Sequence, residues 1–421
     1  MVINRKMKNY IKIFLVFILL SVNGVSQEKP KVNWSLTAQI WARYSDLNEG
    51  TKINGETTNS YTDVSIRRLR IPVSSQITPK IYAAAMFGGN NFNESNKNFP
   101  LHVLDLYVEY RFDKAIEVGL GKSGWIGLNR WALRSSKTLM GLDSPLFTLN
   151  TVNKNDDLAR NLGVWFKGQI GKIDYRLIVS NPIVVSSISN SGKVDFANNR
   201  PRARISSYVK YQFWENESNK SSYQTGTYIN SKKVWNIGGG FEYQKKAMSD
   251  GDTSLSITNL YDIKHWSVDS FFSLPISGDE GITAYLGYSH YGFGKNYIRN
   301  LGANGALFSG GTDFNGAGVA FPLMGTGNTL YTQFGYAFSQ TKIVSQAVIF
   351  QPNMSVQYSD WDGLNDKMIL YDATLNMFLS GHGHSNKLSL GFQYRPVFDK
   401  ISLKQKDYKG MLVLQYQISI R

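Results

Sequence analysis

Arginines stand at every second position in two segments of the chain. Arg68 and Arg70 form one such pair, and Arg202 and Arg204 form the other. Alternate residues of a β-strand point to the same side, so each pair would present two guanidinium groups to one surface. A guanidinium group is a planar fork of donors that matches the oxygens of a phosphate. On strands, these pairs predict a surface that attracts anions.

A second set of basic residues lies in the long segment 122–160. It comprises Lys122, Arg130, Arg134, Lys137, Lys154 and Arg160, against Asp143, Asp156 and Asp157. Arg130 and Arg134 are four residues apart, so a helical turn there would put both on one face. A connector of this length is seldom without structure of its own. If the chain forms a barrel, we expect this segment to fold into its pore as a constriction loop. The alternative is an extracellular loop on the rim of the barrel.

Other chemistry finds little support in the sequence. There is no cysteine, which excludes disulfides, Cys-ligated metals and cysteine nucleophiles. His382 and His384 fall in a predicted turn, where a polar turn is a better interpretation than a metal site. Gly238, Gly239 and Gly240 lie inside a predicted strand and so do not form a phosphate loop. No GxSxG motif occurs. We expect no enzyme, no cofactor and no metal.

The elements that must position the arginines are short alternating segments. Residues 101–112 set Leu104, Leu106 and Val108 on one parity and Asp105 and Glu109 on the other, which is typical of an apolar-out, polar-in strand. About sixteen such segments occur, most of them about ten residues long, which is the length of a tilted membrane strand. They are 34–44, 61–76, 80–90, 101–112, 115–121, 161–170, 173–181, 202–214, 233–244, 262–274, 281–292, 313–322, 328–339, 367–380, 386–395 and 409–420.

Long and short connectors alternate between these segments. Short ones, such as 171–172, would be periplasmic turns, and long ones, such as 293–312 and 340–366, would be extracellular loops. The connector 215–232 breaks this rule, because it falls where a short periplasmic turn is expected and is nevertheless long. The sequence therefore predicts an all-β protein, a transmembrane antiparallel β-barrel of about 16 strands in the outer membrane of a Gram-negative bacterium. The alternative is a soluble all-β protein such as a β-helix or a large sandwich.

The N-terminus has the features of a secretory signal peptide. Basic residues precede the apolar run 13–20, which is too short to span a membrane as a helix, and small residues lead to a cut after Ser26. The alternative is a membrane anchor. Removal of residues 1–26 leaves 42 basic and 31 acidic residues, a net charge of +11 for the barrel, residues 27–421.

The polar side chains of these strands would face the lumen, and their charged members are mainly basic. A basic lumen favours anions, because charges in a low-dielectric channel concentrate the opposite ion. Alternatively, these bases pair with lumenal acids or bind lipopolysaccharide at the rim. The inward bases are Arg43, Arg68, Arg70, Arg111, Lys167, Arg176, Arg202, Arg204, Lys210, Lys387 and Arg395, and the inward acids are Asp105, Glu109, Asp174, Glu242 and Asp372.

Several segments resemble the phosphate-selective porin O/P family in its Bacteroidetes form. They are SIRRLRI at 65–71, LDLYVEYRF with EVGLGKSGWIGLNRWALRSS, GTYINSKKVWNIGGGFEYQ at 226–244, HWSVDSFFSLPI at 265–276, YGFGKNYIRNLGANGALF at 291–308 and YDATLNMFLSGHGHSNKLSLGFQY at 371–394. The resemblance implies a sixteen-stranded homotrimer that passes small solutes passively. It would place Arg68, Arg70, Lys122, Arg130 and Arg134 near the conduction path.

The chain differs from that family at two places. Ser-Gly-Trp-Ile-Gly replaces a Pro-Phe-Gly-like stretch, which favours a general anion-leaning porin over a phosphate-specific one. The last residue is Arg421 rather than an aromatic residue, so the terminal assembly signal is imperfect. The expected partners are outer-membrane lipid and lipopolysaccharide and small anions such as phosphate, with no nucleic acid. A non-conducting barrel that binds surfaces through its loops is the competing function. A TonB-dependent transporter would need a plug domain, and a fatty-acid channel an N-terminal hatch; neither is visible.

Overall fold

The structure is a computed structural model of the chain. It describes residues 30–94, 101–124, 127–154, 159–183, 185, 193–197, 202–251, 259–276, 278–379, 381 and 383–421. The predicted signal peptide, residues 1–26, lies outside the described residues. No helix in the described part of the chain is long and apolar enough to cross a membrane.

Sixteen antiparallel strands close into one barrel, which confirms the predicted fold class. Each strand pairs with its neighbours in chain order, and β24 closes the barrel by pairing with β2 over ten residues, from Leu36 with Ile420 to Ser45 with Met411. The barrel strands are β2 (Leu36–Asp46), β5 (Ser60–Gln76), β6 (Ile81–Phe92), β7 (His102–Arg111), β8 (Glu117–Ser123), β9 (Asn161–Ile170), β10 (Ile173–Ser180), β12 (Arg204–Gln212), β13 (Val234–Ser249), β14 (Leu260–Pro275), β15 (Gly281–Gly292), β19 (Gly327–Ala337), β21 (Gln346–Trp361), β22 (Met368–Phe378), β23 (Asn386–Phe398) and β24 (Gln405–Ile420).

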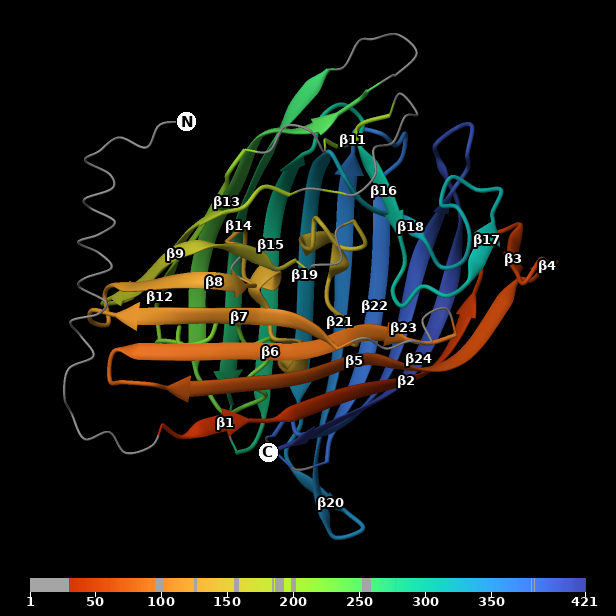
Figure 1. The fold of residues 1–421 in the computed structure, drawn as a ribbon. Helices are drawn as coiled ribbons and strands as arrows, with labels where there is room; N and C mark the ends of the chain where they lie inside the picture. The colour runs from red at the N-terminus through yellow and green to blue at the C-terminus, as the bar shows by residue number, and fades with distance from the viewer. Residues whose placement is uncertain are drawn as a thin grey trace.

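Short strands and single helical turns decorate this barrel. β1 extends the pairing of β5, β11 pairs with β13, and β20 forms a hairpin with β21 that projects from the bottom of the barrel in Figure 1. The short strands are β1 (Val32–Trp34), β3 (Thr51–Ile53), β4 (Glu56–Thr57), β11 (Asp195–Phe196), β16 (Ile298–Leu301), β17 (Phe308–Gly310), β18 (Phe321–Gly325) and β20 (Thr341–Ile343), and the 3₁₀ helices are η1 (Trp131–Leu133), η2 (Ser136–Thr138) and η3 (Leu146–Thr148).

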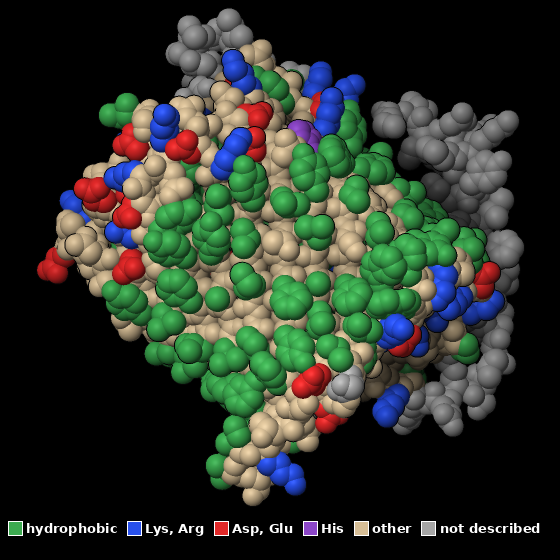
Figure 2. Space-filling view, turned by 180° about the vertical axis from the view of Figure 1, so that it is seen from behind, with side chains coloured by type: hydrophobic (Ala, Val, Ile, Leu, Met, Phe, Trp, Pro, Cys, Tyr) green, Lys and Arg blue, Asp and Glu red, His purple; other side chains and the backbone are tan. Residues whose placement is uncertain are grey.

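Outward side chains form an apolar belt around the barrel. Figure 2 shows apolar side chains over the middle of the wall and charged ones mainly at its ends. The exposed belt includes Leu106, Leu120, Val268, Leu286, Phe334, Met354 and Leu412. A closed barrel leaves no unpaired strand edge exposed to lipid, which could not hydrogen-bond to its backbone groups. A closed barrel with such a belt is the architecture of Gram-negative outer-membrane proteins, and the chain spans that membrane.

β-Bulges in β5 and β7 change the strict alternation expected from the sequence. In β5 the extra residue is Arg67, because Gln39 pairs with Arg68 and Ile40 with Ile66. In β7 the extra residue is Leu104, which the sequence placed on the outward parity. Leu104 is instead buried and Val103 is exposed. A bulge puts two residues opposite one and shifts the facing of the residues beyond it.

One barrel strand was assigned to the wrong segment. Residues 313–322 do not form a barrel strand, because β18, which pairs with β16, belongs to the loop between β15 and β19. The expected long loop 340–366 instead contains β21, which pairs with β19 and β22. Pro352 has no N–H group to donate to a sheet. It is tolerated because it lies immediately before Asn353, the first residue of β21 that pairs with β19.

Two connectors fold into the barrel from opposite ends. The inward loop, residues 124–160, joins β8 to β9 from the loop end, and it lies between the front and back walls in Figure 1. The 213–233 connector joins β12 to β13 from the turn end. Its residues Glu217, Ser222 and Thr227 are buried, which accounts for its unexpected length. The two segments meet at a parallel bridge between Arg134 and Gln224.

Candidate functional site: an arginine-lined cavity in the lumen

Five arginines surround one cavity of about 110 Å³ inside the barrel. We call it the arginine cavity. Arg67, Arg68 and Arg70 come from β5, and Arg134 and Arg160 come from the inward loop. The β5 arginines reach the lumen together because the bulge at Arg67 turns a side chain inward that strict alternation would have pointed toward lipid.

Asp143 neutralises part of the charge on β5. Its Oδ2 accepts hydrogen bonds from Arg67 Nε at 3.0 Å and from Arg67 Nη2 at 2.8 Å, and its Oδ1 accepts one from Arg68. Burial alone would raise the pKa of Asp143, but Arg67 and Arg68 more than offset it and hold the pKa well below its usual range. Asp143 is therefore ionised and ties the inward loop to the barrel wall.

Arg70 and Arg134 have only neutral partners among the described residues. Arg70 Nη1 donates to the carbonyls of Leu69 and Gly89, both at 2.7 Å, and Arg134 Nη1 donates to the carbonyl of Trp131 at 2.7 Å. Arg134 Nε is buried and finds no partner in the described part of the chain. Burial, followed by the positive charge of Arg68, lowers the pKa of Arg134 to about 9. An anion in the cavity would relieve this crowding of positive charge.

Arg160 is held by a small polar cluster. Its Nε lies 3.2 Å from Asp105 Oδ1, and its Nη2 donates to the Tyr223 hydroxyl at 3.0 Å. The Tyr223 hydroxyl donates in turn to Asp105 Oδ2 at 2.7 Å. Tyr223 belongs to the 213–233 connector, so the cavity takes part of its wall from the turn end. Within the described residues, five guanidinium groups thus meet two carboxylates, Asp105 and Asp143, which leaves about three positive charges.

The predicted site residues divide into three groups. Arg68, Arg70 and Arg134 lie at the arginine cavity. Arg130 and Arg204 are buried in the lumen but are paired with Glu217 and Glu242. The remaining three, Lys122, Lys137 and Arg202, lie elsewhere.

Those three residues do not line the arginine cavity. Lys122 pairs across the sheet with Leu106 and Leu162, both exposed on the outer face, so its predicted place in the lumen is wrong. Lys137 is half-buried in η2, and burial followed by the charge of Arg421 lowers its pKa. Arg202 is exposed, because β12 begins only at Arg204.

Arg130 and Arg134 do not share a helical face, contrary to expectation. The helical turn η1 covers only Trp131–Leu133, and Arg134 is already extended, with ψ of 149°. Arg130 instead holds the two inward segments together. Its Nη2 and Nη1 donate to Glu217 Oε1 and Oε2 at 2.7 and 2.8 Å, and its guanidinium carbon lies 3.5 Å from the centre of the Phe271 ring.

Glu217 receives further donors from the barrel wall and from its own connector. Lys210 Nζ and Asn236 Nδ2 donate to its Oε2 at 2.7 and 2.9 Å, and the Tyr228 hydroxyl donates to its Oε1 at 2.8 Å. Burial alone would raise the pKa of Glu217, but Arg130 and Lys210 hold it well below its usual range. This carboxylate is the centre of the contact between the inward loop and the 213–233 connector.

Most other inward bases are neutralised, as the alternative interpretation of the sequence allowed. Arg43 pairs with Asp63 at 2.7 Å, Lys167 with Glu109 at 2.7 Å and Arg176 with Asp174 at 3.5 Å. Paired charges of this kind support the wall rather than attract ions. Lys387 and Arg395, in contrast, donate to backbone carbonyls and have no carboxylate partner among the described residues. Lumenal positive charge without a paired carboxylate thus lies both at the arginine cavity and on β23.

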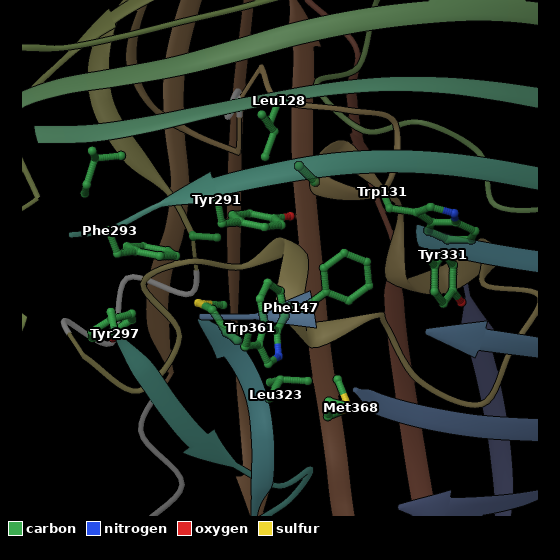
Figure 3. Packing of buried hydrophobic residues seen from close by; sticks show 14 of the residues in the cluster. Leu128, Trp131, Phe147, Tyr291, Phe293, Tyr297, Leu323, Tyr331, Trp361 and Met368 are labelled. Atoms are coloured by element: carbon green, nitrogen blue, oxygen red, sulfur yellow. The ribbon is translucent and has the colours of Figure 1, made fainter. Parts of the chain in front are cut away.

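Apolar packing fixes the inward loop on its other side. Figure 3 shows Trp131 and Phe147 from the loop among Tyr291, Tyr331 and Trp361 from the barrel wall. The rings of Trp131 and Tyr331 meet edge to face at 6.3 Å between centroids, and those of Phe147 and Tyr331 lie 5.5 Å apart. Ala132 and Ala159 of this cluster also line the arginine cavity, so the apolar packing and the cavity adjoin each other.

The triple glycine in β13 provides close contact with the inward loop. A Cβ on Gly240 would lie 2.4 Å from the carbonyl oxygens of Gly127 and Leu128, so only glycine lets the loop sit there. Among the described residues, no group of three or more His, Cys, Asp or Glu side chains could hold a metal ion.

Two cavity residues were not singled out in the sequence. Arg67 would face lipid in a regular strand, and that unfavourable placement was itself the available signal for a bulge. Tyr223 lies in the connector whose length was anomalous, but its side chain carries no pattern that predicts contact with Arg160. Tertiary contacts between distant segments created both positions.

Comparison with solved structures places the fold among outer-membrane porins. The outer membrane channel DcaP of Acinetobacter baumannii matches with a TM-score of 0.51 and 13% identity, over 94% of this chain and 100% of that chain. Pseudomonas putida OprB matches with a TM-score of 0.53 and 10% identity, over 92% of this chain and 94% of that chain. An anion-selective porin from Comamonas acidovorans gives a TM-score of 0.49 and 11% identity, over 93% of this chain and 100% of that chain.

At these identities the likeness concerns the fold alone, and it rests on the first two structures. No protein-family model and no curated protein sequence matches the chain. The resemblance to the phosphate-selective porin O/P family therefore stays a prediction.

Proposed function

We propose that the chain is a passive channel for small hydrophilic solutes that prefers anions, phosphate among them. The arginine cavity carries this proposal. Among the described residues, five arginines meet two carboxylates there, in a barrel interior that lipid surrounds, and such an excess of positive charge raises the local concentration of anions. The inward loop would act as the constriction, because Arg134 and Arg160 reach the cavity from it.

One observation favours a second function, a barrel that does not conduct. The aromatic packing around Trp131 and Phe147 and the buried ion pairs fill much of the lumen. A barrel closed in this way would act through its extracellular loops as a binding surface. Measured conductance separates the two functions, and neither function is catalytic.

The decisive experiment is a reversal potential across a KCl gradient, with purified protein in a planar bilayer. We expect chloride preference for the unmodified chain. The double substitution Arg70→Gln with Arg134→Gln should lower that preference severalfold, because these two guanidinium groups lack a carboxylate partner among the described residues. Arg202→Gln removes an equivalent charge at an exposed position and should change it little. Cation preference, or equal effects of both variants, would contradict the proposal.

The assembly state is part of the proposal. The family resemblance implies a homotrimer, and we expect lipopolysaccharide and outer-membrane lipid as its surroundings. Native mass spectrometry of the detergent-extracted protein measures the number of chains directly. A single-chain mass for the conducting protein would exclude the trimer while leaving the channel function intact.

A further inference from the structure

The lining of the arginine cavity is not uniformly polar. Besides the five arginines, it includes the apolar side chains of Leu146, Leu149 and Val152 from the inward loop and Leu301 from the loop between β15 and β19. Leu146, Leu149 and Leu301 also pack against the aromatic cluster of the lumen. These three side chains are therefore held in place and cannot turn away from the cavity.

Such a lining treats two kinds of anion differently. Inorganic phosphate carries oxygens in every direction, so some of its hydration would be lost against leucine and valine without replacement. A carboxylate with a short hydrocarbon body meets guanidinium groups at one end, and its body removes apolar surface from water at the other.

We propose that the arginine cavity selects small organic carboxylates with an apolar body over inorganic phosphate and over carboxylates with a polar body. This inference rests on the proposed channel function and names the solute class. The carboxylate binds Arg70 and Arg134, and the hydrocarbon lies against Leu149 and Val152. The volume of about 110 Å³ suits a body of a few carbon atoms, since about 10–15 Å³ on this measure accommodates one water.

Butyrate and glycerate are the test anions, because both are monocarboxylates of similar size but only butyrate has an apolar body. Each is added to the conducting protein in KCl, and the concentration that halves the chloride conductance is measured. We expect this concentration to be about fourfold lower for butyrate than for glycerate, the ratio for one buried methylene group, and lower for butyrate than for phosphate. Calorimetric titration of the detergent-solubilised chain gives the same ratios without requiring conductance.

Leu149→Asn places an amide in the apolar lining and should abolish the difference between butyrate and glycerate while chloride preference remains. Val152→Thr keeps the shape of the side chain and should reduce the difference between butyrate and glycerate. It keeps the inference testable if Leu149→Asn does not fold. Ile401→Asn makes a similar change at a fully exposed turn residue and should leave the difference intact.

The outcomes separate this inference from the function on which it rests. Chloride preference with equal action of butyrate, glycerate and phosphate would overturn the inference alone. Conductance without anion preference would overturn the proposed anion selectivity. Absence of conductance together with equal calorimetric affinities would overturn both.

Discussion

At the scale of single residues, Glu217 has the greatest influence on the inside of the barrel. It joins Arg130 of the inward loop to Lys210 of β12 and is itself part of the 213–233 connector. The inward loop and the distant β12 with its following connector thus depend on one carboxylate. Removing one partner of a buried pair leaves uncompensated charge, which costs more than the pair contributes.

We therefore expect Glu217→Gln to destabilise the barrel by about 3–5 kcal/mol. Arg130 and Lys210 would remain buried with no carboxylate between them. Equilibrium urea denaturation in lipid vesicles measures the loss. An unchanged free energy of unfolding would show that water or another carboxylate replaces Glu217.

The pH dependence supplies a second test of the same residue. The folded-state pKa of Glu217 is depressed, so its stabilisation is present above the unfolded pKa of about 4.3 and is lost as pH falls toward the folded pKa. The unmodified chain should therefore lose stability below about pH 4, and Glu217→Gln should lose less. Parallel pH profiles for both proteins would contradict this assignment.

At the scale of elements, the glycines of β13 decide where the inward loop can lie. Gly240 faces the lumen beneath Gly127 and Leu128, whereas the Cβ of an alanine at Gly239 would meet only Ser267 O at 3.5 Å. Gly239 and Gly240 are adjacent in β13, yet only a side chain at Gly240 would meet the inward loop.

Gly240→Ala should push the inward loop off β13 and cost about 1–3 kcal/mol through overpacking. It should also change the single-channel conductance, because the loop carries Arg134 and Arg160. Gly239→Ala is the matched control and should alter neither property. Equal behaviour of the two variants would mean that the loop does not depend on this contact.

At the scale of the whole molecule, the apolar belt determines how the barrel sits in lipid. Val268 is at the middle of β14 and is 52% exposed on the outer face, while Ile401 is 93% exposed in the turn between β23 and β24. Both side chains are accessible, but only Val268 would lie in the hydrocarbon region.

Val268→Arg should destabilise the folded barrel in lipid vesicles by about 2–4 kcal/mol, the cost of a cation near the bilayer midplane. Ile401→Arg should stay within about 0.5 kcal/mol of the unmodified chain. The difference should shrink in detergent micelles, whose thin and deformable hydrocarbon layer lets water reach the arginine. A large loss of stability in both variants would mean that Ile401 also lies in the hydrocarbon region.

The sequence by itself determined the barrel, because a period of two residues, strands of about ten residues and alternating connector lengths are local properties of the chain. It also indicated that arginines gather in the lumen. The segment 340–366 was expected to be a long loop, and its strand β21 is defined only by pairing with β19 and β22.

Only the tertiary structure decided which arginines keep their charge available. Pairing of Arg130 with Glu217, of Arg204 with Glu242 and of Arg67 with Asp143 depends on contacts between segments tens of residues apart. A bulge moved Arg67 into the lumen, and the outward facing of β8 at Lys122 removed that lysine from it. Residue types and their period set which side of a wall a charge occupies, but long-range packing sets whether another charge already neutralises it.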